Sequence, residues 1–298
     1  MTHRVEHTTD PAAFLALAGE HLAADPVLAT VVTTVAQRAV GAPVPDHPQW
    51  WVSVLDGERV VGVAMRTASF APYPLYVLPM PEAAALALGR WLHERGEDAT
   101  AVNGAQPAAG QVLAALAGPR GEVVEEVECD RLWEVRTVVD PPPVPGRARQ
   151  ARLDEVDLVA SWTLRFMPEA DAQAGRAARE GEGSHLDAAW ATDRIGQGLV
   201  WLWEVDGEPV HLSAHSVPAY GVGRVGPVYT PPEHRGHGYA SALVAHVSRL
   251  LLDQGARACL FTDRDNPVSN GVYARLGYEP QAEMARLVTS PVTTPGPA

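Results

Sequence analysis

Apolar residues spaced three and four positions apart indicate the helices in the second half of this chain. The clearest apolar stripe predicts a helix from about 239 to 254 and consists of Leu243, Val244, Val247, Leu250 and Leu251. Further helices are expected over 154–167, near 185–197 and near 267–276. An apolar stripe of this width must be covered, so the helix at 239–254 is expected to pack against a sheet.

Short apolar runs between these helices predict the strands of that sheet. Residues 199–216 form two such runs around an Asp-Gly turn, a sequence typical of a β-hairpin. Strands are also expected at 224–230 and 258–262, and a final strand pair at the end. Strands and helices that alternate in this way favour an α+β unit.

The first half of the chain repeats part of this pattern. Residues 51–64 align with residues 201–214 at a constant offset of 150, with six identities that include the Asp-Gly turn. Between the halves, residues 140–146 contain four prolines, which fix φ and lack an amide donor. We therefore expect one fold used twice: a domain at 1–139, a linker at 140–146, a domain at 147–289 and a disordered tail at 290–298.

Charge and hydropathy restrict the partners and the compartment. The 298 residues carry a formal charge of −13, which disfavours nucleic acid and anionic membranes as partners. No apolar run is long enough to span a bilayer, and the first residues lack the apolar core of a signal peptide. A cytoplasmic protein without membrane contacts is expected.

Some residue types exclude whole classes of chemistry. The chain contains no lysine, so it cannot use a lysine nucleophile or Schiff base. Cys129 and Cys259 are too few for a disulfide framework and have no metal spacing, so both are expected to be buried apolar side chains. His211 and His215 share one face of a strand, but no third ligand is evident and no metal is expected.

A short glycine-containing loop is the first candidate for chemistry. Arg235–Ala240 lies between an expected strand and an expected helix, where successive amides can converge with the positive end of the helix dipole. A pyrophosphate fits such an anion cradle, although the loop lacks the lysine of a Walker-type phosphate loop. The alternative is a tight turn without a ligand.

A second motif follows about thirty residues later and changes the picture. The loop is part of Val-x-Thr-x-Pro-x-x-Arg-Gly-x-Gly-x-Ala from Val228, with its proline doubled, and Asn266 begins Asn-x-x-Ser-x-x-x-Tyr-x-x-x-Gly-Tyr. Two of the chain's three asparagines lie in this second segment. In this order and separation, the two motifs resemble the signature motifs of the GNAT superfamily of N-acetyltransferases over roughly 147–289.

The resemblance implies two tandem GNAT-like domains, each a mixed, mostly antiparallel sheet flanked by helices. Residues 71–81, which follow the first hairpin, contain no Arg-Gly-x-Gly, so the N-terminal domain is expected to be degenerate and to bind the cofactor poorly. Residues 102–107 are a possible echo of the asparagine motif, without its tyrosine. The chemistry is thus expected in the C-terminal domain.

The resemblance also implies acetyl-CoA as co-substrate and places its ligands. The pyrophosphate would be held by the amides of Arg235, Gly236, His237, Gly238, Tyr239 and Ala240. The pantetheine arm would pair with Val228, Tyr229 and Thr230 and contact Asn266, with Ser269 alongside. Tyr273 would be the general acid that protonates the departing thiolate.

The general base is less defined. Many members of the superfamily have a glutamate on the strand before the loop, but residues 220–230 contain no carboxylate. Glu204 and His215 on the hairpin are the nearest candidates for the base, and a solvent-facing glutamate and a strand histidine are the alternative interpretations. An amine that enters neutral, or a chain of water molecules, would need neither residue.

The acceptor is expected over the hairpin and the first two helices of the second domain. The aromatic residues there are Trp162, Phe166, Trp190, Trp201 and Trp203, and the acids are Glu169, Asp171, Glu180, Glu182, Asp187 and Asp193. Aromatic walls with carboxylates suit a partly apolar amine. Core tryptophans beneath a solvated acidic face are the equal alternative.

These features favour an acetyl-CoA-dependent N-acetyltransferase that acts on a primary amine of a small molecule, as a monomer or homodimer. A non-catalytic acyl-CoA-binding or sensing module is one alternative hypothesis. A protein or peptide amine acetyltransferase is another.

Overall fold

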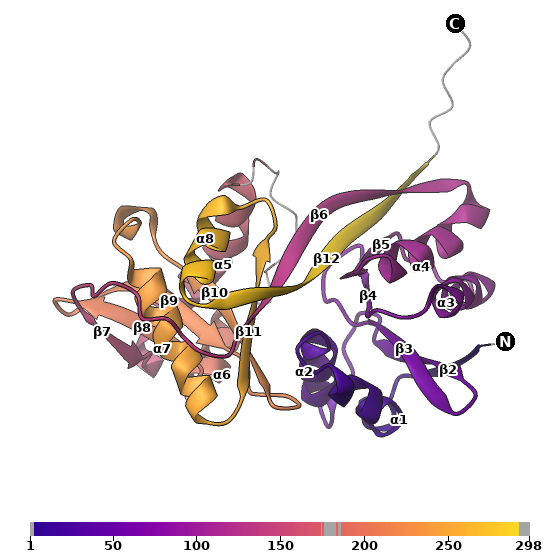
Figure 1. Ribbon diagram of the computed structural model, residues 1–298, viewed down its shortest axis with the longest axis horizontal. Helices are drawn as coiled ribbons and strands as arrows, with labels where there is room; N and C mark the ends of the chain where they lie inside the picture. Colours follow the sequence, from indigo (N-terminus) through magenta and orange to yellow (C-terminus); the bar gives the residue numbers. More distant parts are fainter. Residues whose placement is uncertain (1–2, 174, 176–182, 184–185, 292–298) are drawn as a thin grey trace, which may run out of the picture. The chain divides into compact units, whose positions relative to one another are not determined.

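The computed structural model describes residues 3–173, 175, 183 and 186–291 (Figure 1). The chain forms two compact units: unit 1 comprises Met1–Arg131 and Ala282–Ala298, and unit 2 comprises Leu132–Gln281. Both halves of the sequence contain the same succession of elements, β-α-α-β-β-β-α-β-α-β. The tandem α+β fold predicted from the repeated hairpin is thereby confirmed.

The first half supplies five short strands and four helices before a long strand, β6. They are β1 (Arg4–Thr8), α1 (Pro11–Ala24), α2 (Thr30–Ala39), β2 (Trp50–Asp56), β3 (Arg59–Arg66), β4 (Leu75–Val77), α3 (Glu82–Glu94), β5 (Ala101–Ala105), α4 (Ala108–Ala117) and β6 (Glu122–Val135).

The second half repeats this order and ends in the long strand β12. Its elements are β7 (Arg147–Gln150), α5 (Val156–Gln173), α6 (Ala188–Gly196), β8 (Val200–Val205), β9 (Glu208–His215), β10 (Val222–Tyr229), α7 (Tyr239–Asp253), β11 (Arg257–Asp263), α8 (Pro267–Arg275) and β12 (Tyr278–Pro291). Apart from the final strand pair, the expected helices and strands of this half are found close to their predicted bounds, although the helix expected over 154–167 extends to Gln173. Both Asp-Gly hairpins, β2–β3 and β8–β9, are also confirmed.

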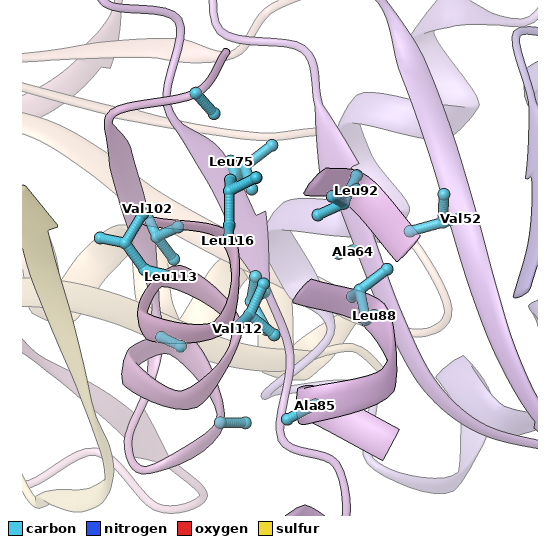
Figure 2. Packing of buried hydrophobic residues seen from close by; sticks show 14 of the residues in the cluster. Val52, Ala64, Leu75, Ala85, Leu88, Leu92, Val102, Val112, Leu113 and Leu116 are labelled. Carbon is cyan, nitrogen blue, oxygen red and sulfur yellow. The ribbon is translucent and has the colours of Figure 1, made fainter. Parts of the chain in front are cut away.

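Unit 1 is built around a sheet with the strand order β1-β2-β3-β4-β5-β12-β6. Its core lies between this sheet and helices α3 and α4, and Figure 2 shows Leu88 and Leu92 of α3 with Val112 and Leu116 of α4. The helices approach closely at Gly89, where an added Cβ would lie 2.5 Å from the carbonyl oxygen of Val112. Only a residue without a side chain fits there.

Unit 2 has the strand order β6-β11-β10-β9-β8-β7. One hydrophobic cluster packs α7 and α8 on the sheet, with Leu243 and Val247 buried in it. A second cluster, which contains Leu202, Leu212 and Tyr229, packs α5 and α6 on the sheet. Of the predicted helix stripe at 239–254, Leu243, Val244, Val247 and Leu251 are buried, and Leu250 is partly exposed.

The last strands do not follow the expected domain boundaries. We expected a strand pair at the end of the second domain, but the chain forms the single strand β12, whose residues 282–291 belong to unit 1. There β12 pairs with β5, and Ala285 and Leu287 enter the core of unit 1. In exchange, residues 132–135 of β6 belong to unit 2. Each sheet thus includes a strand from the other half of the sequence.

The expected linker and tail also differ in detail. Residues 140–146 form neither helix nor strand, as four prolines dictate, but they pack on unit 2. The carbonyl oxygen of Pro145 accepts a hydrogen bond from the indole of Trp203 at 2.8 Å. Ser290 and Pro291, placed in the tail by composition, belong to β12, and residues 292–298 lie outside the described residues.

Candidate functional site

Strands β10 and β11 separate and leave an opening in the sheet of unit 2. They pair in parallel only at Val222–Arg224 and Arg257–Cys259, and a β-bulge follows between Val225 and Val228. A cavity of about 440 Å³ lies in this region. Its lining includes all twelve residues expected to bind the cofactor: Val228, Tyr229, Thr230, Arg235, Gly236, His237, Gly238, Tyr239, Ala240, Asn266, Ser269 and Tyr273. The two sequence motifs therefore meet in one cavity.

The glycine loop gives this cavity an anion cradle. Gly236 and Gly238 have φ of 79° and 83°, a backbone conformation that side chains disfavour. Helix α7 begins directly after Gly238 without a side-chain cap, and its first internal hydrogen bond is donated by Ala242. The amides of Tyr239, Ala240 and Ser241 thus have no partner within the helix. Uncapped amides at the positive end of a helix are suited to bind phosphate.

The asparagine motif shapes the opposite wall. The side-chain oxygen of Asn266 accepts hydrogen bonds from the amides of Val268 and Ser269, both at 3.1 Å, and so caps α8. Asn270 donates to the carbonyl oxygens of Asp263 and Arg264, which fixes the turn after β11. The asparagines therefore build the start of α8, and contact between Asn266 and a pantetheine arm stays a prediction.

Tyr273 lies on α8 and faces the cavity. The residue is 8% exposed, and its ring packs edge-on against Tyr278 with centroids 5.8 Å apart. Its hydroxyl makes no hydrogen bond with any residue that the structure describes. Burial raises the pKa of this phenol. Tyr273 therefore keeps its proton at neutral pH and can donate it to a group in the cavity.

Glu169 is a carboxylate that reaches the cavity from α5. From the sequence, Glu169 is one of six acids expected near the acceptor. In the structure, its carboxylate contacts Tyr229 and Arg235. The Tyr229 hydroxyl donates to Glu169 Oε1 at 2.9 Å, and the Arg235 guanidinium pairs with Oε2. Burial opposes the charge on Glu169, but hydrogen bonds from Tyr229, Arg235 and Arg165 outweigh it and lower its pKa. Spacing along the chain offered no signal for this long-range contact.

A buried histidine supports the end of β10. His211 is fully buried, with Nδ1 2.7 Å from the hydroxyl of Thr230 and Nε2 3.0 Å from the hydroxyl of Ser213. Burial lowers the pKa of His211 to about 3, so the imidazole is neutral. The carbonyl oxygen of Thr230 in turn accepts from Arg235 Nε at 3.0 Å. These contacts hold Thr230 and Arg235 at the cavity wall.

The two candidate bases do not line the cavity. Glu204 accepts hydrogen bonds from Arg147 and Arg149, and these bonds lower its pKa. His215 is buried at the end of β9, where its Nδ1 lies 3.1 Å from the carbonyl oxygen of Ser216. Burial lowers the pKa of His215. Glu204 is thus committed to an ion-pair network on β7 and β8, which the sequence could not show.

The tryptophans expected around the acceptor lie in the core or pack against it. Trp162 is 7% exposed and packs on Tyr229, and Trp201 packs edge-on against His246. Of the aromatic set, Phe166 lines the cavity. The core interpretation therefore holds for Trp162, while Glu180 and Glu182 lie outside the described residues.

Within its described residues, unit 1 shows neither this opening nor the cradle. Strand β4 pairs with β5 along its whole length, and its last residue, Val77, lies opposite Gly104. The loop before α3 contains Pro79 and Pro81, which have no amide hydrogen, and Glu82 adds a negative charge in the first turn. Asn103 lies within β5 and not at a helix start, so the possible echo of the asparagine motif at 102–107 was wrong.

Three further observations concern possible ligands and surroundings. Both cysteines are buried, as their residue type predicted. Within the described ranges, no three His, Cys, Asp or Glu side chains cluster to hold a metal ion. Among the helices of those same ranges, none combines the length and apolar character needed to cross a membrane.

Comparisons with known proteins agree with this architecture. A family model described as FR47-like protein matches residues 204–287. No curated protein matches the chain. Among solved structures, a GCN5-related N-acetyltransferase from Sphaerobacter thermophilus is similar at a TM-score of 0.58 and 19% identity, over 96% of this chain and 95% of that one.

Two more solved structures are similar along nearly their whole length. A GNAT-family acetyltransferase from Colwellia psychrerythraea has a TM-score of 0.56 and 10% identity, over 96% of this chain and 99% of that one. A tandem GNAT protein from the clavulanic acid biosynthesis pathway has a TM-score of 0.52 and 15% identity, over 98% and 99%. In fold, the chain is therefore similar to GNAT acetyltransferases, among them a tandem GNAT protein, as its two motifs implied.

Proposed function

We propose that unit 2 binds acetyl-CoA and transfers its acetyl group to a primary amine of a small molecule. One observation carries the proposal: the residues of two separate motifs line a single cavity beside an uncapped helix start. Among the described residues of unit 1, strand β4 pairs with β5 along its whole length and leaves no free edge of this kind. The chemistry is thus assigned to one half of the chain.

The residues present fit acetyl-CoA. The loop Arg235–Ala240 supplies backbone donors for the pyrophosphate, and the two positive-φ glycines let these donors converge. Val228, Tyr229 and Thr230 form the free edge of β10 after its pairing with β11 ends, and a pantetheine arm can pair with such an edge. Ser269 and Asn266 close the cavity from α8. Acetyl-CoA supplies an activated acyl group as a thioester.

Tyr273 serves as the general acid in this proposal. The amine nitrogen attacks the thioester carbon, so that the C–N bond forms and the C–S bond breaks. Tyr273 gives its phenolic proton to the leaving thiolate, the proton of the amine passes to water, and Tyr273 then takes a proton back from water. A protonated phenol that faces the cavity and has no competing hydrogen bond among the described residues suits this role.

The amine needs no dedicated base if it reacts in its neutral form. Neither Glu204 nor His215 lines the cavity, and both are engaged elsewhere. Amides near Val228 on the free edge of β10 stabilise the charge that develops on the thioester oxygen. In this proposal, catalysis rests on positioning and on these fixed dipoles.

Two other functions have some support. The lack of a carboxylate in residues 220–230 favours a non-catalytic acyl-CoA-binding module. The second alternative is a protein or peptide amine as the acceptor. Intact Tyr273 with a free hydroxyl favours catalysis over mere binding.

Thiol release from acetyl-CoA tests the proposal. The full chain is incubated with acetyl-CoA and a panel of small primary amines, and free CoA is measured with a thiol reagent. We expect release that depends on at least one amine. Tight CoA binding without release across the panel would support the binding module instead, and release only with peptides would support the peptide acetyltransferase.

A further inference from the structure

Glu169 occupies an unusual place in unit 2. It belongs to α5, whereas the other charged and phenolic groups that line the cavity come from β10, the glycine loop and α8: Tyr229, His234, Arg235, His237, Tyr239, Tyr273 and Arg275. Among the described residues that line the cavity, Glu169 is the one carboxylate. Its side chain is 26% exposed, so solvent and ligands can reach it. A single carboxylate in a cavity whose other charged side chains are basic is a candidate binding group for a cation.

The surrounding contacts hold this carboxylate in place. Tyr229 Oη donates to Oε1 at 2.9 Å, and Arg165 Nε donates to the same oxygen at 3.0 Å. Arg235 pairs with Oε2. The ring of Tyr229 is itself fixed by Trp162, with ring centroids 6.0 Å apart. The carboxylate is therefore a fixed negative charge on the α5 side of the cavity.

We propose that Glu169 binds the protonated amino group of the acceptor and so selects amines at the α5 side of the cavity. This inference rests on the proposed function, because it names the group that receives the acceptor. Glu169 acts as an anchor and not as a base, because a carboxylate held in its ionised form is a poor proton acceptor. Its lowered pKa agrees with that role. The anchored amino group loses its proton to water before it attacks the thioester in its neutral form.

The charges around Glu169 make amine binding depend on the cofactor. Arg165 and Arg235 together outweigh the single negative charge of Glu169, so the free chain disfavours an ammonium group there. Arg235 also belongs to the loop that forms the phosphate cradle. Phosphate groups bound by that loop would add negative charge near Arg235 and would offset this excess of positive charge. The amine is thus expected to bind when CoA is already bound.

The apolar residues of the cavity wall indicate the chemical character of the rest of the acceptor. Phe166, Val268 and Val272 line the same cavity, and Val268 is 74% exposed. Apolar residues in the same cavity as a fixed carboxylate suit a primary amine on an apolar body. A simple probe of this class is 2-phenylethylamine, and 2-phenylethanol is its neutral counterpart of similar shape.

Calorimetry with these two probes tests the anchor directly. The full chain is saturated with CoA, and each probe is titrated into it. We expect the amine to bind about tenfold or more tightly than the alcohol, the range of a charge-assisted hydrogen bond. We also expect weaker amine binding without CoA. Equal affinities, or no amine binding in the millimolar range, would overturn the proposal.

Substitution of the carboxylate provides the matched comparison. Glu169→Gln keeps the shape but removes the charge, so the preference for the amine should fall to about that for the alcohol. Asp154→Asn removes an exposed charge elsewhere in unit 2 and should keep the preference. CoA affinity, measured separately for each variant, shows that the cradle is intact. A preference that survives in Glu169→Gln would contradict the anchor.

The same samples separate this inference from the proposed function. Amine binding that requires Glu169 but gives no thiol release with acetyl-CoA would leave the anchor standing and reject acetyl transfer. Thiol release with other amines, together with no effect of Glu169→Gln on amine preference, would retain acetyl transfer and reject the anchor.

Discussion

The carbonyl oxygen of Val77 faces Gly104 across β4 and β5 at a distance that leaves no room for a side chain. A Cβ on Gly104 would lie 2.2 Å from that oxygen. In unit 1 the two strands therefore remain joined at the end where the corresponding strands of unit 2 have already separated. Strand β4 ends at this pair, whereas β10 continues to Tyr229 beyond its last pair with β11, and the cavity of unit 2 lies at that unpaired end.

We predict that the full chain binds one CoA molecule. Prolines in the loop of unit 1 remove amide donors, and its paired strands offer no free edge. Isothermal titration calorimetry with CoA measures the stoichiometry. A value of two sites of similar affinity would show that unit 1 binds the cofactor despite its closed sheet.

The cradle depends on the backbone of Gly236. Its φ is 79° and a Cβ there would meet nothing within 4 Å, so Gly236→Ala adds backbone strain without a clash. Left-handed backbone costs a non-glycine residue about 1–2 kcal/mol, and relief of this strain would turn the loop amides away from the ligand. We expect CoA affinity to fall about tenfold.

Gly255 provides the control for this change. It has a φ of 77° and open space around it, but it follows α7 and does not line the cavity. Gly255→Ala should cost similar unfolding free energy and leave CoA affinity unchanged. Equal affinities in both variants would show that the loop conformation is irrelevant to binding.

Tyr273→Phe should lower the turnover number at saturating acetyl-CoA by about 10²-fold or more, because the thiolate loses its positioned acid. CoA affinity should change little. Tyr278→Phe is the matched control, since the Tyr278 hydroxyl bonds Ser248 at 2.8 Å, away from the cavity. That variant should lose stability and keep its turnover. Unchanged turnover in Tyr273→Phe would reject the assignment.

Leu287→Ala should loosen unit 1, although its position in the sequence suggests the other domain. Leu287 is 2% exposed and packs with Val102 and Leu113 in the core of unit 1. Loss of such a side chain costs about 2–5 kcal/mol. Hydrogen exchange should become faster at β5.

Leu260→Ala serves as the comparison, because Leu260 is 1% exposed in the core of unit 2. It should speed exchange at β10 and β11 first. If Leu287→Ala instead loosened unit 2 alone, the assignment of residues 282–291 to unit 1 would be wrong.

We predict that the protein loses stability in mild acid because His211 is protonated when the chain unfolds. The folded pKa of His211, about 3, lies below the value of an unfolded histidine, so the unfolded chain takes up the proton first. Stability is therefore full above the unfolded pKa and falls as the pH drops below it. From about pH 7.5 to about pH 5.5 this histidine alone should remove about 1 kcal/mol.

Urea unfolding at the two pH values measures this contribution. His211→Gln cannot take up the proton, so its loss of stability between the two values should be smaller by that amount. An identical loss in wild type and variant would show that His211 titrates normally in the folded chain.

Local sequence patterns predicted most helices and strands of unit 2. The features that they did not predict depend on contacts between residues far apart in the chain. Helical spacing found α7, and the Asp-Gly turn found β8–β9, because both depend on neighbouring residues. The partners of Glu169 come from β10 and from the loop after it, so no spacing along α5 could reveal them. The placement of β6 and β12 is a long-range feature as well. The alternation of residues along a strand shows which face is buried, but it does not show which sheet the strand joins.

The most direct measurement follows the acetyl group itself. The full chain is incubated with acetyl-CoA labelled with ¹³C in its acetyl group and with the amine panel, and products are identified by mass spectrometry. We predict labelled amide on the amine nitrogen in equal amount to the CoA released, and almost none with Tyr273→Phe. Label recovered only as unreacted acetyl-CoA, with CoA bound normally, would contradict acetyl transfer by unit 2.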